Sequence, residues 1–160
     1  MPQDFVNHAG DGESSSYTFQ LEYETSDRLM ISRLENVKSA KEASTIKLRE
    51  MTDITLLALQ WTRDAKRFVD DVEVLRGLEP PYRVSEFRLE GYNSTSFPSW
   101  VMDIDAYLPG LTSIEMSDLT SCNNLPPLGQ LPNLKRLEIR QMNGIKKIDT
   151  DLYGGSRAFP

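Results

Sequence analysis

Two residue types on which enzymes and metal sites often depend are almost missing from this sequence. It holds one histidine, His8, and one cysteine, Cys122, in 160 residues. Zinc sites and Cys–His or Ser–His catalysis need several ligands, or a base placed beside a nucleophile. A single cysteine also excludes a disulfide within the chain, and this usage is typical of a reducing, cytoplasmic setting. The sequence therefore predicts no metal and no enzyme activity, with Cys122 as a buried structural residue.

Motifs for nucleotides and membranes are absent as well. No Gly-x-x-x-x-Gly-Lys-Ser/Thr phosphate loop occurs, and Gly154-Gly155 lacks the following lysine, so it is expected to form a plain turn. No stretch approaches the roughly 18 apolar residues of a membrane-spanning helix. The first residues also lack the basic start and apolar run of a secretory signal, so the Asn93-Ser94-Thr95 sequon is best explained by chance. We expect no cofactor and no membrane association.

The chain has fewer basic than acidic residues. The chain has 18 Lys and Arg against 24 Asp and Glu, and a pI near 4.9. A nucleic-acid-binding domain would normally show a basic face, so this class is not expected. Residues 1–24 contain five acidic residues and no basic one, and the first 16 are poor in aliphatic side chains. They predict a flexible acidic tail over residues 1–25, although Tyr17 to Tyr23 alternates as an edge strand would.

One short pattern recurs about five times from residue 29 to residue 139. It consists of an aliphatic residue, two variable positions, and then two apolar residues that flank one variable position. Neighbouring side chains of a strand point to opposite faces, so the flanking residues point inward and the residue between them points outward. The last apolar residue of each unit gives the marker positions Ile31, Leu59, Leu89, Met116 and Ile139.

The markers are separated by 28, 30, 27 and 23 residues, and leucine-rich repeats run roughly 20–29 residues. One unit cannot bury its apolar edge alone, so stability arises when units stack. The sequence therefore predicts an α/β fold, a leucine-rich-repeat solenoid over residues 26–160. We expect a partial horseshoe with a parallel β-sheet on the concave face and short helices or irregular returns on the convex face. Both ends look truncated, because no polar capping repeat is evident.

The segments between the strands carry helix signals in the first half only. Ser39-Ala40-Lys41-Glu42 has the form of a capping box and predicts a helix to about Met51. Asp70 and Asp71 suit the start of a second helix, which the prolines Pro80-Pro81 end. Prolines at 98, 126 and 127 favour extended or single-turn returns later in the chain. After the fifth strand, a tight inward spiral is expected at Met142, Ile145 and Ile148.

The outward positions of the five strands form the candidate functional surface. The first two strands present a largely uncharged surface and the last three a charged surface of mixed sign. Such a face is either a solvated sheet with cross-strand pairs such as Arg88–Glu115, or a docking surface that mixed charge makes selective. Trp61 and Trp100 are further candidates for partner contacts, although packing explains them more simply. The candidate residues of the concave face are Arg28, Met30, Gln60, Glu86, Arg88, Glu90, Glu115, Arg136, Glu138 and Arg140.

Six segments stand in a fixed order within residues 29–160. They are Leu34-Glu35-Asn36-Val37, Leu57-Ala58-Leu59-Gln60-Trp61, Val74-Leu75-Arg76-Gly77-Leu78-Glu79-Pro80, Gly91-Tyr92, Phe97-Pro98-Ser99-Trp100 and Leu125-Pro126-Pro127-Leu128-Gly129-Gln130-Leu131-Pro132. The series resembles the repeat region of plant nucleotide-binding, leucine-rich-repeat disease resistance proteins of the coiled-coil class.

This resemblance implies a protein-recognition module in plant defence. In that family the repeats help to recognise pathogen effectors or guarded host proteins, and they restrain a nucleotide-switch domain. The expected partner is therefore an effector, a guarded protein or the nucleotide-binding domain of a parent receptor. Nucleotide binding itself is not carried over, because its motifs are missing here. Two other interpretations stay open, namely a substrate adaptor of a ubiquitin ligase and a non-functional fragment of a resistance gene.

Overall fold

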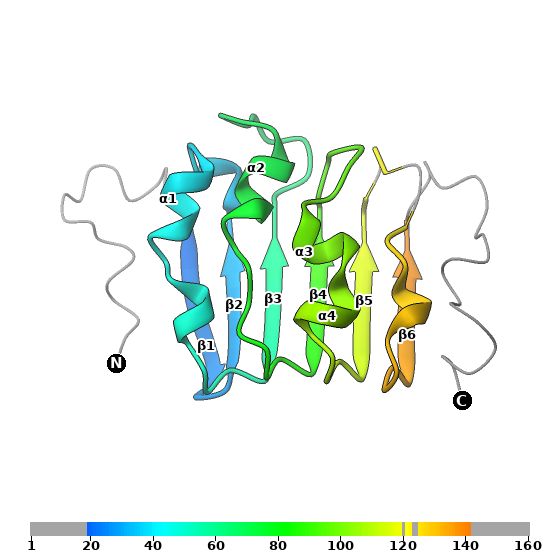
Figure 1. Cartoon of the computed structure of the whole chain (residues 1–160). Helices are drawn as coiled ribbons and strands as arrows, with labels where there is room; N and C mark the ends of the chain where they lie inside the picture. Colours follow the sequence, from blue (N-terminus) through cyan, green and yellow to red (C-terminus); the bar gives the residue numbers. More distant parts are fainter. Residues whose placement is uncertain (1–18, 120, 123–124, 142–160) are drawn as a thin grey trace.

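A six-stranded β-sheet forms the frame of the protein. The computed structural model describes residues 19–119, 121–122 and 125–141. The strands lie side by side in chain order, and helices and turns pack on one face of the sheet (Figure 1). Strands β2 to β6 run parallel to one another. The strands are β1 (Gln20–Thr25), β2 (Arg28–Ser32), β3 (Leu56–Gln60), β4 (Glu86–Glu90), β5 (Ser113–Ser117) and β6 (Arg136–Arg140).

The register of the parallel strands follows the repeat marker. Ile31 lies opposite Leu59, and the row continues through Leu89, Met116 and Ile139. The first four of these side chains are at most 1% exposed. The uneven spacing of 28, 30, 27 and 23 residues is thus absorbed between the strands and not within them. This confirms the predicted strands and supports an α/β repeat fold.

The prediction of a sheet that is parallel throughout is wrong at one edge. Strand β1 pairs with β2 in antiparallel orientation, with Leu21 opposite Ile31. Leu21 is buried, and the Tyr23 hydroxyl lies 3.8 Å from the sulfur of Met51. Residues 20–25 therefore belong to the sheet, which corrects the expected tail boundary at residue 25 and agrees with the alternation noted there. A two-residue turn suffices for this hairpin, whereas a parallel crossover needs a dozen residues or more.

The first return segment is less helical than predicted. Helix α1 spans Ala40–Ser44, and its N-cap hydroxyl, on Ser39, accepts a hydrogen bond from the Glu42 amide at 3.0 Å, as the capping box implies. The helix does not reach Met51. Thr45 bonds back to the Glu42 carbonyl through its hydroxyl at 2.6 Å, and Lys47 has a left-handed φ of 56°. Both features interrupt the α-helical hydrogen-bond pattern before the turn at Leu48–Glu50.

The second helix ends earlier than its prolines suggest. Helix α2 spans Asp71–Arg76 and buries Val74 and Leu75, as expected, but it stops at Gly77. Two single-turn helices follow later, α3 (Ser99–Met102) and α4 (Ile104–Tyr107). Among its described residues, the fourth return, between β5 and β6, holds only a 3₁₀ turn, Leu128–Gln130. These short returns after β4 agree with the prediction. Predictions were also made for Met142, Ile145, Ile148, Gly154-Gly155 and His8, and these residues lie outside the described part of the chain.

Small polar residues connect the repeats just before each strand. The Thr55 amide donates to the Asp27 carbonyl, Ser85 to Thr55, and Thr112 to Ser85, each at 2.8 Å. The hydroxyls of Thr55, Ser85 and Thr112 point to the same carbonyls at 3.2–3.5 Å. Lys135 extends the backbone series to Thr112. This ladder ties each strand entry to the preceding one, which the hydrophobic pattern alone does not predict.

Both tryptophans pack in the core, as the simpler interpretation predicted. Trp61 and Trp100 are 1% and 2% exposed. Trp100 makes an edge contact with Phe87 and donates its Nε1–H to the Leu75 carbonyl at 2.8 Å. Trp61 makes an edge contact with Tyr92, but its Nε1 has no hydrogen-bond partner among the described residues.

This difference predicts unequal costs for two matched substitutions. Trp100→Phe removes a hydrogen bond to the Leu75 carbonyl, which keeps only the bond from the Leu78 amide at 3.0 Å, whereas Trp61→Phe removes a donor that is already unsatisfied. We expect Trp100→Phe to lower the free energy of unfolding by about 0.5–1.5 kcal/mol more than Trp61→Phe does, which is the net contribution of one hydrogen bond. Urea denaturation of both variants measures this, and equal losses would contradict it.

Gly91 occupies a position that no other residue suits. Its φ is +80°, and a Cβ placed there would collide with the Trp61 carbonyl oxygen. The chain needs this close approach because the Trp61 amide donates to the Glu90 carbonyl, while Gly91 donates to Ser117. These bonds continue the sheet past the strand ends.

A glycine-to-alanine comparison tests this constraint. Gly91→Ala forces a left-handed alanine against backbone atoms, and the conformation alone costs about 1–3 kcal/mol. Gly110→Ala is the control, because no neighbouring atom lies within 4 Å of the methyl group that alanine adds there. We expect a clear fall in thermal midpoint for the first variant and almost none for the second.

Candidate functional site

The sheet face without helices carries nearly all of the predicted site residues, and we call it the open face. The alternation of each strand sends its buried pair under the helices and the residues between them to this side. Met30 is 37% exposed, and Arg88, Glu90, Arg136 and Arg140 are exposed as well. One outward position departs from expectation, since Leu56 is only 3% exposed. Arg28, Gln60, Glu86, Glu115 and Glu138, also predicted, are partly exposed there.

Most of the outward charges on strands β4 to β6 neutralise one another. Arg88 lies directly opposite Glu115 in the register, with Nε and Oε1 3.6 Å apart. Arg140 reaches the same carboxylate at 3.7 Å and Glu138 at 2.8 Å, and Arg136 reaches Glu138 at 3.0 Å. The hydrogen bond from Arg140, with help from Arg136, holds the pKa of Glu138 below its ordinary value. The mixed-sign surface is thus an ion-pair network.

Strands β1 to β3 form a different surface, with an apolar floor. A hollow of about 510 Å³ lies over Met30, Leu56 and Ala58 and is bordered by Glu22 and Arg88, among others. At its edge, Arg28 donates to Glu24 at 3.0 Å, and this bond raises the pKa of the guanidinium. A second hollow of about 160 Å³ adjoins it and reaches Glu90 and Glu115. Glu22 and Glu24 were missed as site residues, although the alternation of residues 20–24 already placed them on one face.

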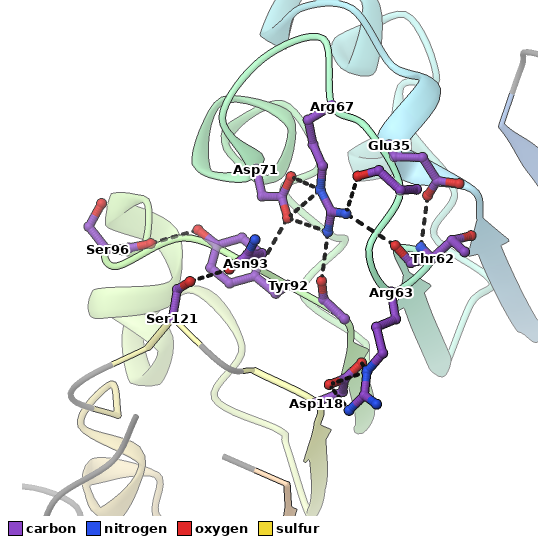
Figure 2. A network of polar contacts seen from close by, with 12 residues as sticks. Glu35, Thr62, Arg63, Arg67, Asp71, Tyr92, Asn93, Ser96, Asp118 and Ser121 are labelled. Carbon is purple, nitrogen blue, oxygen red and sulfur yellow. Dashed lines mark hydrogen bonds and ion pairs between the residues drawn. The ribbon is translucent and has the colours of Figure 1, made fainter. Parts of the chain in front are cut away.

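A second polar cluster lies beyond the carboxyl ends of β3 to β5 (Figure 2). The Asp71 carboxylate, 1% exposed, accepts hydrogen bonds from Arg67 and from the Asn93 amide at 2.8 Å. Ser121 donates to the side-chain oxygen of Asn93. Glu35, which is also buried, accepts from the Thr62 amide at 2.8 Å. The sequence signalled Asp71 only as a helix start, so this role was not predicted.

Arg67 uses its full donor capacity inside the cluster. Nε and Nη2 donate to Asp71, Nη2 also donates to the Gly91 carbonyl, and Nη1 donates to the carbonyls of Thr62 and Ala65. A guanidinium has five N–H groups, so none remains for a ligand. Nearby, Arg63 is held by Asp118 at 2.7 Å. The hollow of about 330 Å³ between these residues is therefore bordered by a structural clamp on the loop after β3.

The described part of the chain shows neither a metal-binding cluster nor a membrane-spanning helix. It contains no group of three or more His, Cys, Asp and Glu that could hold a metal ion. Within the same residues, no helix has the length and apolar content to cross a membrane. Cys122 is buried, as predicted. The Tyr92 hydroxyl is directed to the Ser96 carbonyl at 2.6 Å, and burial raises its pKa.

The clamp predicts a large difference between two neighbouring arginines. Arg67→Met leaves the buried Asp71 carboxylate without its partner, a loss of about 3–5 kcal/mol in the free energy of unfolding. Arg63→Met removes a pair whose arginine is 58% exposed, which costs at most about 1 kcal/mol. Urea denaturation of the two variants distinguishes these values. A small effect of Arg67→Met would mean that the cluster does not hold the loop.

Three relatives found by comparison with known proteins are all named as disease resistance proteins. A putative disease resistance protein of Arabidopsis thaliana is 38% identical over 82% of this chain and 10% of its own length. Disease resistance protein RGA2 of Solanum bulbocastanum is 27% identical over 79% of the chain and 14% of its own length. RPP13-like protein 1 of Arabidopsis thaliana, also a putative disease resistance protein, is 26% identical over 93% and 15%. The chain therefore spans only a small part of the length of these relatives.

No solved structure matches the sequence. The profile of the R13L1/DRL21 leucine-rich repeats covers residues 21–142. That range begins within β1 and extends just past β6, so it coincides with the sheet described above. The chain belongs to the R13L1/DRL21 leucine-rich-repeat family, and it is a repeat region resembling that of plant disease resistance proteins.

Proposed function

We propose that this chain is the protein-recognition module of a plant disease resistance protein and acts in the defence response. In this proposal the repeats form a solenoid whose open face is the concave side, and a partner docks on that face. The partner is a pathogen effector, a guarded host protein or the nucleotide-binding domain of the parent receptor. The module acts in the cytoplasm, without a cofactor of its own and without catalysing a reaction.

One observation carries this proposal, which is the contrast between the two polar surfaces. The cluster around Arg67 is satisfied internally, and its donors are used up. The open face instead presents side chains from every described strand in register, over an apolar floor with hollows. Concave surfaces of this kind are what stacked repeats offer to partners.

Affinity on such a surface depends on a few well-placed side chains and not on area. The ion-pair network of β4 to β6 supplies orientation, because mixed charge favours one docking register and opposes others. The apolar side chains of β2 and β3 contribute to affinity because a docked partner removes them from water. The two halves therefore have different tasks in the proposed docking.

The test inverts part of the charge pattern of the open face. In the triple variant Arg88→Glu, Glu115→Arg and Arg136→Glu, the first two changes exchange the partners of one ion pair. The changes at residues 115 and 136 lose the pairs with Arg140 and Glu138. These pairs lie at the surface and contribute at most about 1 kcal/mol each, so the fold is expected to persist. We expect affinity for the partner to fall at least about tenfold, or 1.4 kcal/mol. The partner is first captured from plant cells by a photo-crosslinking residue at Ser117, and affinity is then measured by calorimetry with the purified protein.

The control exchanges an ion pair away from the open face. Glu73 and Arg76 pair at 2.5 Å on helix α2 and are both exposed. The variant Glu73→Arg with Arg76→Glu should bind with unchanged affinity. Unaltered binding by the triple variant, with its fold retained, would sink the proposal that the partner docks on the open face.

A further inference from the structure

The two hollows of the open face adjoin each other and share lining residues. Both are bordered by Met30, Ala58 and Arg88, which are neighbours across β2, β3 and β4 in the register. Met30 is 37% exposed, which is high for a large apolar side chain in the middle of a sheet. Met30 and Ala58 together form a shallow apolar surface between the two hollows, and we call this surface the seat. A partner's apolar side chain placed there would be desolvated on several sides.

The charges around this seat are unbalanced. Arg28 pairs with Glu24, and Arg88 pairs with Glu115, so both arginines that border the hollows are already neutralised. Glu22 and Glu90 also border the hollows, one on each side of the seat, and neither takes part in an ion pair within the described residues. Glu90 is exposed on β4, and Glu22 is exposed on β1 directly opposite Met30. The seat therefore lies between two unneutralised carboxylates.

The register fixes how far apart these carboxylates stand. Glu22 and Glu90 are separated by three strand spacings of about 4.8 Å and by two residues along the strand, which places their Cα atoms roughly 16 Å apart. In an extended peptide, side chains at positions i, i+2 and i+4 share one face, and the outer two are about 13–14 Å apart. Long cationic side chains bridge the remaining distance.

We propose that the β1–β4 half of the open face binds an extended, basic segment of a partner protein with the pattern cation–x–apolar–x–cation. The apolar side chain rests on Met30 and Ala58, and the two cations pair with Glu22 and Glu90. The segment runs across the strands. This inference rests on the proposed docking function of the open face and adds the chemistry of what is bound.

The experiment measures peptide binding by fluorescence anisotropy with the full chain at low ionic strength. The probe is a labelled peptide with the core Lys-Thr-Leu-Thr-Lys, and two comparison peptides replace both lysines by glutamate or the leucine by serine. We expect the basic peptide to bind at least tenfold more tightly than either comparison peptide. Because exposed charges are screened over about 10 Å at 0.1 M salt, the preference over the glutamate peptide should shrink as salt is added.

Variants then locate the site. Glu22→Gln with Glu90→Gln should weaken binding of the basic peptide about tenfold. Glu50→Gln with Asp105→Asn is the matched control, because these acids are exposed in the return segments and the net charge changes equally. The control pair should change binding less than twofold. Ala58→Tyr, which fills the seat with a residue that suits a strand, should also weaken binding, and circular dichroism verifies that each variant is folded.

The outcomes separate this inference from the function on which it rests. Equal losses in both pairs of variants would show general attraction to an acidic chain and overturn the inference, as would the absence of binding. Tighter binding of the glutamate peptide, lost in Ala58→Tyr, would overturn the basic chemistry while leaving the open face as a docking surface. Binding of the basic peptide that neither Ala58→Tyr nor the Glu22 and Glu90 changes affect would overturn the site.

Discussion

The parallel register of the strands is the constraint on which the rest of this structure depends. Each strand buries two apolar side chains under the helices, and because side chains alternate, the residue between them is committed to the open face. A slip of one residue would bury Arg88 and expose Phe87 and Leu89, so the core opposes it strongly. The row from Met30 through Ala58 and Arg88 to Glu115 is therefore as well fixed as the core row beside it.

Hydrogen bonds between polar groups also align the strands, in addition to the burial of apolar side chains. The Asp27, Thr55, Ser85 and Thr112 ladder aligns the strand entries, and the bonds between Trp61 and Glu90 and between Gly91 and Ser117 align the exits. At the exit side, Arg67 saturates its donors on Asp71 and on carbonyls from two returns. This division leaves the strand ends rigid and internally satisfied, so that a surface with unsatisfied charge and open hollows lies on the strands themselves.

Much of this arrangement can be predicted from the sequence, and the exceptions have one cause. The five parallel strands, the capping Ser39, the buried tryptophans and the outward charged positions all follow from short-range periodicity. The antiparallel β1, the early end of α1 and the Arg67–Asp71 clamp do not, because each depends on particular contacts that apolar periodicity does not record. These contacts are Leu21 with Ile31, the Thr45 hydroxyl with the Glu42 carbonyl, and Arg67 with the Gly91 carbonyl. The neutralisation of Arg136 and Arg140 by Glu138 was also hidden, since it requires side-chain directions that a sequence pattern does not give.

The ion pairs on β4 to β6 change which partners the open face can distinguish. The sequence predicts a candidate docking surface over the whole outward face, with charges most frequent on the last three strands. In the structure those charges largely satisfy one another, and exchanging an internal ion pair for an intermolecular one brings little net affinity. The first strands hold fewer charges, but Glu22 on β1 and Glu90 at the end of β4 stand unneutralised beside the apolar seat of Met30 and Ala58, which a partner can desolvate. Selectivity on this face is therefore governed less by how many charges it carries than by which of them remain without a partner.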